Sequence, residues 1–296
     1  MLHVEHSKNL SEKETFIYLK VSDHALSKEV FSLVAEENGN VLKTHPQPEK
    51  NEIGKYYQSE NYISHTDVKN SLFDKLYHIV RKIATKQKLR NIEKITHQKG
   101  KILDIGAGTG EFVKAAKKSG WISEGVEPDA GARKKALEKG VTLHSDTKQY
   151  ADKSFDVVTL WHVLEHVYYP DEQVKKIHRL LKEEGIAVIA VPNFTCYSAL
   201  YYKNHWAAFD VPRHLWHFSP NYLKKLFTSE QFECIKTAAL YQDAFYINLL
   251  SEKYKTGKSN PVRAFWIALK CNLLGRKKEK CATMVYYFRK KSKEAI

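Results

Sequence analysis

The chain has 296 residues, 43% of them hydrophobic and 28% charged, which is typical of a globular protein and excludes a fibrous or disordered one. It has no run of about 18 apolar residues, and from its polar start we expect no signal peptide. Its four cysteines form no C-x-x-C pair, so we expect a cytoplasmic protein without a transmembrane segment or structural zinc. The formal net charge is +14 at pH 7, and residues 251–296 alone hold 13 Lys and Arg against 3 Asp and Glu. Such a basic segment can bind nucleic acid, anionic lipid or an acidic substrate, or it can simply be a solvated surface.

Residues 1–66 are expected to form an N-terminal accessory region. Segments 16–22 and 29–46 predict short strands, with a hairpin turn at Asn38-Gly39-Asn40. Residues 67–99 predict a linking region, helical over 68–95 because apolar residues recur at intervals of three and four: Val68, Leu72, Leu76, Ile79, Val80 and Ile83.

From residue 100 onward the predicted elements alternate between strand and helix. Strands are predicted at 101–106, 121–127, 141–145, 155–161 and 186–192, and helices at 111–119, 129–139 and 171–183. This alternation implies parallel strands joined by right-handed crossovers, hence a Rossmann-like, doubly wound α/β sheet. An irregular stretch rich in aromatics is predicted next, at 193–221. A helix at 221–230, a strand at 232–242, a mostly helical segment at 244–274 and a last strand at 281–291 are predicted to follow it.

Residues 106–110, with the sequence GAGTG, lie between a predicted buried strand and a predicted helix, as in nucleotide-binding turns. A dinucleotide turn has the spacing G-x-G-x-x-G and binds a pyrophosphate at the helix N-terminus. Here the spacing is G-x-G-x-G, and Glu111 stands where the third dinucleotide glycine would fall. Its carboxylate opposes a pyrophosphate but not a ligand with a sulfonium and an ammonium group, so NAD-dependent oxidoreduction is disfavoured.

Two carboxylates accompany this turn. Asp104 lies two residues before the first glycine, where it can receive a cationic amino-acid group. Glu127 ends the next predicted strand, where one carboxylate can bind two ribose hydroxyls, although that feature alone also suits NAD. Asp104, the G-x-G-x-G spacing and Glu127 together make the specific signal.

On these residues the chain resembles the class I S-adenosylmethionine-dependent methyltransferases. Their first and second motifs and their fourth and fifth strands are similar to LDIGAGTG, GVEPD, DKSFDVVTLWHVLEHVYYP and LLKEEGIAVIAVPN. The segment PRHLWHFSPNYLKKLF looks like the branch of small-molecule methyltransferases grouped as methyltransferase type 23. The resemblance implies a seven-stranded sheet with its last strand antiparallel, and an N-terminal region and linking helix packed on the edge of that sheet.

The resemblance also implies which residues bind S-adenosylmethionine, with S-adenosylhomocysteine as the product. Asp104 and the turn hold the methionine part, Glu127 holds the ribose, Asp146 lies near the adenine and Trp161 walls the cofactor. Asp146 could instead cap its loop, and Trp161 could be plain core packing. The full predicted set of cofactor-binding residues is Asp104, Gly106, Ala107, Gly108, Gly110, Glu127, Pro128, Asp146 and Trp161.

The segment WHVLEHV places His162, Glu165 and His166 at i, i+3 and i+4, which would share one face of a helix. It is similar to the E-x-x-E-H metal site of some catechol and RNA-end methyltransferases of this fold, with His162 in place of the first Glu. A His-rich version would suit zinc or iron. In many relatives the Glu-His pair only caps the turn, so we expect no divalent metal. Likewise residues 35–39, AEENG, stand where relatives carry a C-x-x-C-G knuckle, and predict a degenerate, zinc-free ribbon.

Residues 205–220, HWAAFDVPRHLWHFSP, combine aromatic and titratable side chains after the fifth strand, where this fold usually places the acceptor pocket. We therefore expect acceptor or lid segments at 193–221 and 244–280. Methyl transfer needs positioning and, for a hydroxyl or activated carbon, removal of a proton, which suits histidine. The predicted catalytic residues are, in order, His214, His217 and His162. Alternatively Arg213 and these histidines only pin the lid.

Residues 100–296 therefore predict a methyltransferase domain that transfers a methyl group, preferably to oxygen or carbon, of a small-molecule or lipid-linked acceptor. The apolar segments 244–250 and 262–274, flanked by lysines, could contact a membrane surface peripherally or simply pack over the last two strands. One alternative is RNA methylation; the basic C-terminal part supports it, but no RNA-binding module does, so a nucleic acid partner is not expected. The other is a non-catalytic S-adenosylmethionine-binding scaffold.

Overall fold

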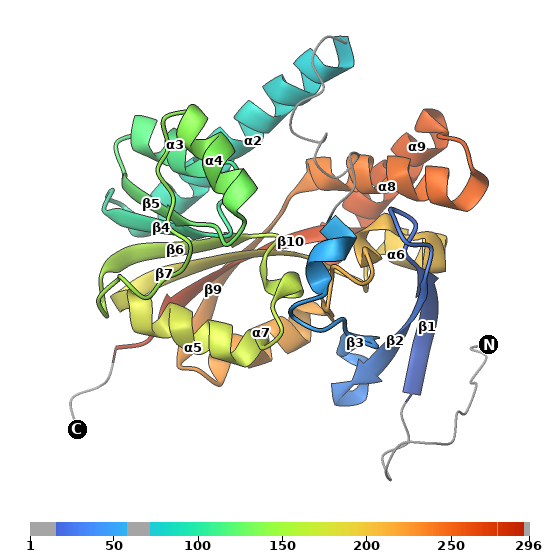
Figure 1. Cartoon of the computed structure of the whole chain (residues 1–296), viewed down its shortest axis with the longest axis horizontal. Helices are drawn as coiled ribbons and strands as arrows, with labels where there is room; N and C mark the ends of the chain where they lie inside the picture. Colours follow the sequence, from blue (N-terminus) through green and yellow to red (C-terminus); the bar gives the residue numbers. More distant parts are fainter. Residues whose placement is uncertain (1–15, 58–71, 277, 293–296) are drawn as a thin grey trace.

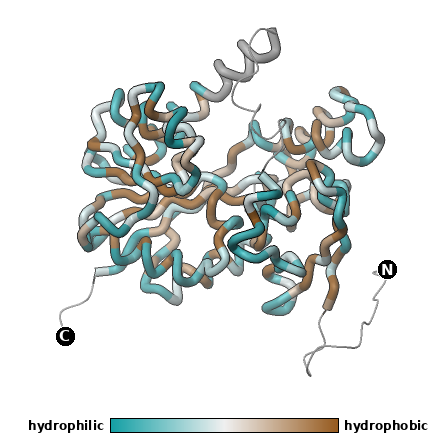
Figure 2. Tube along the Cα trace, viewed as in Figure 1, coloured by the Kyte–Doolittle hydropathy of each residue, from teal (hydrophilic) through white to brown (hydrophobic). Residues whose placement is uncertain are grey.

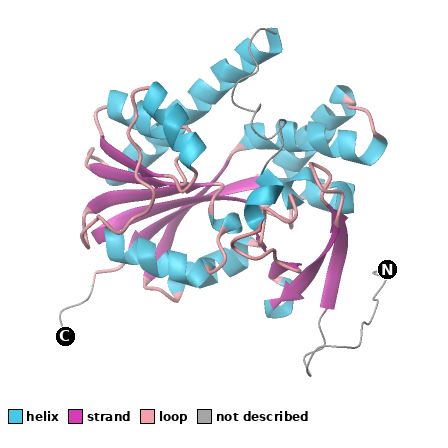
Figure 3. Ribbon diagram, viewed as in Figure 1, coloured by secondary structure: helices cyan, strands magenta, loops and turns pink. Residues whose placement is uncertain are grey.

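The computed structural model of the chain describes residues 16–57, 72–276 and 278–292. Two sheets organise these residues (Figure 1, Figure 3): a larger one with helices on both faces, and a smaller one that holds the N-terminal strands. Hydrophobic residues follow the larger sheet through the interior (Figure 2).

The larger sheet has six strands in the order β5-β4-β6-β7-β10-β9. Their bounds are β4 (Lys101–Ile105), β5 (Ile122–Val126), β6 (Phe155–Trp161), β7 (Leu181–Pro192), β9 (Phe232–Ala239) and β10 (Thr283–Lys290). Strand β4 is parallel to β5 and β6, and β6 is parallel to β7, whereas β10 is antiparallel to both of its neighbours. The predicted antiparallel last strand is confirmed.

The predicted seventh strand, residues 141–145, is wrong. This segment runs beside β5 but makes a single bridge, between His144 and Val126. The ladder stops there because the chain turns at once: the Asp146 carboxylate accepts a hydrogen bond from the Lys148 amide at 2.8 Å. The sheet therefore has six strands rather than seven.

Both faces of the larger sheet are buried, as its near-continuous apolar strands require. Ile186 and Val188 of β7 share one hydrophobic cluster with Leu89 and Ile92 of α2 (Leu72–Thr96). The alternate residues of β7 face the other side, where α5 (Pro170–Leu180) and α7 (Pro220–Thr228) cover the sheet (Figure 1). The linking helix thus packs on a face of the sheet and not on its edge, contrary to the prediction, because the apolar residues of its second half match that face.

The other helices follow the predicted segments with small changes at their ends. They are α3 (Glu111–Lys118), α4 (Ala130–Glu138), α5 (Pro170–Leu180), α6 (Tyr197–Tyr202), α7 (Pro220–Thr228), α8 (Tyr241–Thr256) and α9 (Pro261–Gly275). Helix α5 ends three residues earlier than predicted, because Leu181 has an extended backbone and begins β7. Among the described residues, no helix is long and apolar enough to cross a bilayer.

The smaller sheet joins two distant parts of the chain. Its strands, in the order β1-β2-β3-β8, are β1 (Phe16–Ser22), β2 (Val30–Glu36), β3 (Val41–His45) and β8 (Trp216–Phe218), all antiparallel. The predicted hairpin turn between β2 and β3 is present, with positive φ at Asn38 and Gly39. The stretch predicted to be irregular, 193–221, is wrong in part, since it contains α6, two short 3-10 helices and β8.

Candidate active site

The predicted nucleotide turn leads from β4 into α3. Gly106, Gly108 and Gly110 have φ values of 72°, 52° and 75°, a left-handed backbone that glycine adopts without strain. A Cβ atom at Gly106 would collide with the Val163 side chain. The turn therefore lies directly against the segment that follows β6, and the carboxyl ends of β4 and β6 contribute to one site.

Asp104, the residue before the last of β4, is a buried carboxyl. Its Oδ1 accepts a hydrogen bond from the Thr159 hydroxyl at 2.6 Å. Burial, only partly offset by this bond and by Lys88, raises the pKa of Asp104 to about 7. A cationic ligand beside the carboxyl would lower this pKa again, so the environment fits the predicted role of receiving an ammonium group.

Glu127 follows β5 and is oriented by two backbone amides. Its Oε2 accepts from the Gly108 amide at 2.8 Å and its Oε1 from the Asp129 amide at 2.9 Å. Each carboxylate oxygen keeps acceptor capacity for a further hydrogen bond, which fits two ribose hydroxyls. The backbone on either side is also fixed, since the Ala107 amide donates to β5 and the Pro128 carbonyl accepts from a side chain of α4.

Two other carboxylates are engaged by the chain itself. Glu111 accepts from Lys139 Nζ at 2.9 Å, so a cation neutralises the charge that was expected to repel a pyrophosphate. Asp146 is exposed and holds the Lys148 amide, which is the loop-cap alternative considered for it. The choice of cofactor therefore depends on Asp104 and the glycine spacing, not on Glu111.

Trp161 ends β6 and borders the turn. The centroid of its ring lies 5.4 Å from the centroid of the Phe112 ring. Lys88 Nζ lies 4.0 Å from the centroid of the Trp161 ring. Within the described part of the chain its buried Nε1 has no hydrogen-bond partner, so this donor is available to a ligand. Lys88 was not predicted as a site residue, because nothing distinguishes it from the other lysines of the linking helix.

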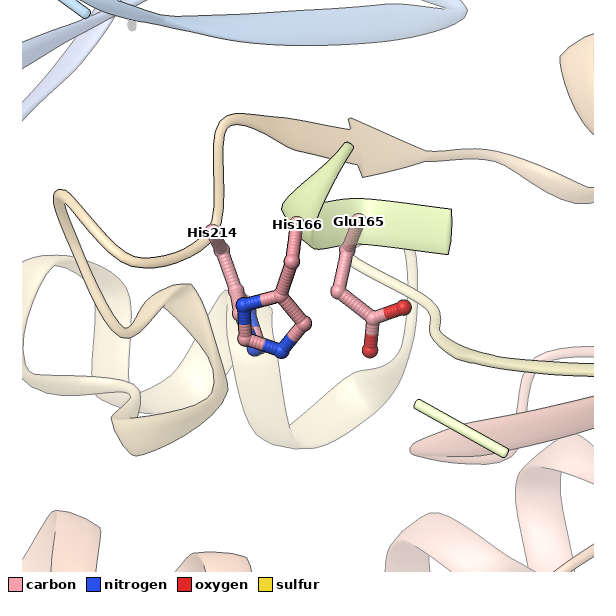
Figure 4. Close-up of side chains that lie close together, drawn as sticks. All are labelled: Glu165, His166 and His214. Carbon is pink, nitrogen blue, oxygen red and sulfur yellow. The ribbon is translucent and has the colours of Figure 1, made fainter. Parts of the chain in front are cut away.

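Three side chains converge where the short 3-10 helix η3 (Leu164–His166) meets the segment before β8 (Figure 4). They are Glu165, His166 and His214, and one nitrogen or oxygen atom of each lies within 4.8 Å of the others. The two imidazoles meet edge to face, with ring centroids 4.6 Å apart. Of the three predicted catalytic histidines only His214 belongs to this cluster, and His166, which sequence analysis treated as part of a motif without assigning it a catalytic role, completes it.

Hydrogen bonds fix the tautomers of both imidazoles. Nδ1 of His214 lies 2.9 Å from the Ala208 carbonyl oxygen, and Nδ1 of His166 lies 3.0 Å from that of Arg213. A carbonyl oxygen can only accept, so Nδ1 of His214 carries the proton and its Nε2 keeps a lone pair. Nδ1 of His166 also lies 3.0 Å from the Tyr57 hydroxyl, which can share the Nδ1 proton with the Arg213 carbonyl, and this arrangement leaves a lone pair on Nε2 of His166 as well. Burial and the neighbouring His214 lower the pKa of His166 to about 4, which keeps its ring neutral.

His162 lies between two carboxylates. Its Nε2 is 3.1 Å from Asp243 Oδ2 of α8, and its Nδ1 is 3.4 Å from Glu165 Oε1. Burial opposes a charge here, but the two carboxylates outweigh it and raise the pKa of His162 to about 9. A ring protonated at neutral pH does not fit the predicted role of a base. The expected shared helical face is also wrong, because His162 precedes η3 with a φ of 58°.

His217 and Arg213 attach the smaller sheet to the site. His217 of β8 places Nε2 3.1 Å from Thr44 Oγ1 of β3, and burial lowers its pKa well below the usual value. Arg213 is buried and donates to Asp23 at 2.7 Å and to Asp210 at 2.8 Å. These contacts correspond to the alternative in which the residues pin the lid.

The cluster can act chemically in two ways. Its two Nε2 lone pairs and the Glu165 carboxylate, which has no hydrogen-bond partner among the described residues, are acceptors around one space. They can share a proton taken from a substrate, or they can bind a divalent cation. Two imidazoles and one carboxylate suit zinc or ferrous iron, and Nδ1 bonds to carbonyls are the outer contacts that metal-bound histidines make. This donor geometry departs from the expectation of no metal.

Strand β10, antiparallel between β7 and β9, distinguishes this sheet from the all-parallel sheets of dinucleotide-binding proteins. With Asp104 and Glu127 at the glycine turn, it places the chain among the class I S-adenosylmethionine-dependent methyltransferases. The sequence profile of the methyltransferase domain family, type 23, matches residues 76–237, and the chain belongs to this family.

Known proteins share parts of this chain. It is 32% identical over 109 residues to the ubiquinone biosynthesis O-methyltransferase of Haemophilus ducreyi, over 32% of this chain and 46% of that protein. It thus spans about half the length of this relative. A Thermotoga maritima S-adenosylmethionine-dependent methyltransferase superposes with a TM-score of 0.53 at 18% identity, over 80% of this chain and 99% of that one. A Burkholderia thailandensis 1,6-didemethyltoxoflavin-N1-methyltransferase, crystallised with S-adenosylhomocysteine, superposes with a TM-score of 0.51 at 14% identity, over 91% of this chain and 99% of that one. The two structures share the fold.

Proposed function

We propose that this protein transfers the methyl group of S-adenosylmethionine to a hydroxyl of a small-molecule acceptor, a class that includes lipid-linked compounds. One observation carries the proposal: His214 and His166 each place a ring nitrogen within 4.8 Å of the buried Glu165 carboxylate, and Nδ1 of each ring lies beside a backbone carbonyl. The name of the ubiquinone biosynthesis relatives supports oxygen as the acceptor atom. The same base could serve an activated carbon acceptor.

The residues around the turn fit the cofactor. S-adenosylmethionine, when bound, supplies an electrophilic methyl group. Asp104 would hold its ammonium group, and the free lone pairs of Glu127 would accept from the ribose hydroxyls. Trp161 would border the cofactor and offer its Nε1 donor, while Asp146 would shape the loop on the adenine side.

His214 is the preferred general base. Its Nε2 would take the acceptor proton while Nδ1 stays bonded to the Ala208 carbonyl. The imidazolium that forms then faces Glu165. Burial favours a neutral Glu165, but the charge of His162, whose Nδ1 lies 3.4 Å away, and the other histidines outweigh it and lower the pKa of Glu165, so the carboxylate is present to stabilise the new charge.

The test is calorimetry with S-adenosylmethionine, S-adenosylhomocysteine and NAD, followed by transfer of labelled methyl to simple catechols and phenols. We expect binding of the two sulfur ligands, and transfer that His214→Gln slows by a factor of about 10² or more while leaving cofactor affinity unchanged. Cofactor binding without transfer to any acceptor would favour the scaffold alternative, and transfer to RNA alone would favour the RNA alternative. Preferential binding of NAD would contradict the proposal.

A further inference from the structure

Helix α9 presents large apolar side chains to solvent. Val262, Trp266 and Leu273 are 67%, 61% and 66% exposed, and Phe265 and Leu274 beside them are about half exposed. Their spacing places them along one side of the helix. The opposite side, which faces the protein, carries mainly small residues: Ala264, Ala268, Cys271 and Gly275. An ordinary surface helix has the reverse arrangement, with its apolar stripe toward the core.

Specific contacts on the inner side fix this orientation. Asn272 donates to the Tyr241 carbonyl of α8 at 3.0 Å. Arg263 donates to the buried Glu252 of α8 at 3.0 Å, and Asn260 caps the start of the helix. Turning α9 to bury its large side chains would break these bonds and leave the buried Glu252 without its cation, with only the hydrogen bond from Tyr202 remaining. The outward apolar face is therefore a built feature of the fold. The packing alternative for residues 262–274 thus describes only the inner side of α9, where Ala268 and Cys271 belong to the core.

The chain segment that carries this face is basic. Residues 253–278 contain eight Lys and Arg and no Asp or Glu. Exposed cations lie at both ends of α9 and within it, among them Lys258, Lys270 and Arg276. A short helix with Trp, Phe and Leu on one side and cations around them is the pattern of helices that lie in the plane of a bilayer and attract anionic lipid. Charge complementarity thus selects a negatively charged membrane surface as the occupant.

The same pair of helices reaches the candidate active site. Helices α8 and α9 pack against each other, and they lie on the same side of the larger sheet's end as the smaller sheet (Figure 1). Asp243, in the first turn of α8, lies 3.1 Å from His162. Contact of α9 with a membrane would therefore bring the acceptor side of the site close to the lipid headgroups.

We propose that α9 docks on membranes that carry anionic phospholipid, with Phe265, Trp266, Leu273 and Leu274 entering the headgroup layer and the surrounding Lys and Arg facing lipid phosphates. This docking rests on the proposed function in one respect only, namely that the enzyme would reach a lipid-linked acceptor at the membrane surface. Docking itself requires no turnover.

The experiment is co-sedimentation of the full chain with vesicles of phosphatidylcholine, alone or mixed with phosphatidylglycerol. We expect binding to the mixed vesicles, weakened by salt, and much weaker binding to the neutral ones. Leu273→Glu should reduce the partition coefficient at least tenfold. The matched control is Leu137→Glu on α4, an apolar residue 62% exposed, which should leave binding unchanged. Arg276→Gln should cost about fivefold.

Two further readouts keep the test decisive. Tryptophan emission should shift to shorter wavelength on mixed vesicles, and Trp266→Phe should abolish that shift. Thermal unfolding and turnover of a water-soluble phenol should be the same for Leu273→Glu and wild type, which separates docking from the proposed methyl transfer. Binding that Leu273→Glu does not weaken, or equal binding to neutral vesicles, would overturn the proposal. A dimer in solution that Leu273→Glu dissociates, without vesicle binding, would instead show that a second copy covers the face.

Discussion

Asp104 should make cofactor affinity depend on pH. In the free protein, burial raises the pKa of this carboxyl to about 7. A bound ammonium group favours the carboxylate and lowers its pKa, so binding requires the proton to leave. If the ligand binds only the carboxylate form, the apparent Kd scales as about 1 + 10^(7−pH) and rises about tenfold from pH 8 to pH 6.

Titration calorimetry with S-adenosylmethionine, in buffers of different ionisation enthalpy, measures both the Kd and the protons released. Asp104→Asn should bind more weakly at pH 8 and lose the component due to the carboxyl, while any titration of the cofactor's own amino group persists and can be subtracted. The control Asp171→Asn, at an exposed position in the first turn of α5, should keep the wild-type slope. A wild-type affinity that is the same at pH 6 and pH 8, or a slope that survives in Asp104→Asn, would refute the reasoning.

The stability of the free protein supplies an independent check with the opposite sign. The folded pKa of Asp104, about 7, lies above the unfolded value of about 3.9. Its contribution to stability is therefore fully present below about pH 4 and is lost as pH rises to about 7. The Tm of wild type should fall relative to that of Asp104→Asn over this range, and added cofactor should reduce the difference.

Three more changes test the site. Glu127→Gln should weaken binding of S-adenosylmethionine by about 10- to 100-fold in calorimetry, because a charged acceptor for two amides and the ribose is lost, and unchanged affinity would place the ribose elsewhere. Arg213→Ala leaves Asp23 buried without its cation and should cost about 3–5 kcal/mol in urea unfolding; a cost under about 1 kcal/mol, as for an exposed pair, would mean that the clamp is weak. Titration with Co²⁺ followed by its visible absorption should show one site that His214→Ala removes and the exposed-residue control His97→Ala retains, whereas no absorption band in wild type would favour the shared-proton role of the cluster.

The strands and the turn of the larger sheet could be predicted because their signals are local. An apolar run that ends in an acid and glycines, as at 101–110, reports burial on both faces and a left-handed turn in the same few residues. The segment 141–145 has similar local propensity but lies at the edge beside β5 alone, so tertiary pairing decided against it. Sequence periodicity likewise predicted helices in 244–274, but it did not say which side of α9 faces in.

The contacts of the candidate site were harder to predict because they join residues far apart in the sequence. His217 meets Thr44 across 173 positions, and His162 meets Asp243 across 81. Strand β8 has only three residues, too few for an alternating pattern, and exists because β3 offers it an edge. No local pattern shows that His214 would face Glu165, so its selection depended on the resemblance and on its residue type.

The pairing of β3 with β8 has a consequence for engineering and for divergence within the family. The segment that presents His214 is held from one side by the β2–β3 hairpin, some 170 residues earlier in the chain, and Arg213 also ties it to Asp23, between β1 and β2. In a chimera that exchanged only residues 193–221 for those of a relative with another acceptor, the new segment would have to pair with a β3 edge to which it is not matched. We expect acceptor preference to be inherited as a pair of segments, the N-terminal hairpin together with the stretch after β7, and successful transplants to move both.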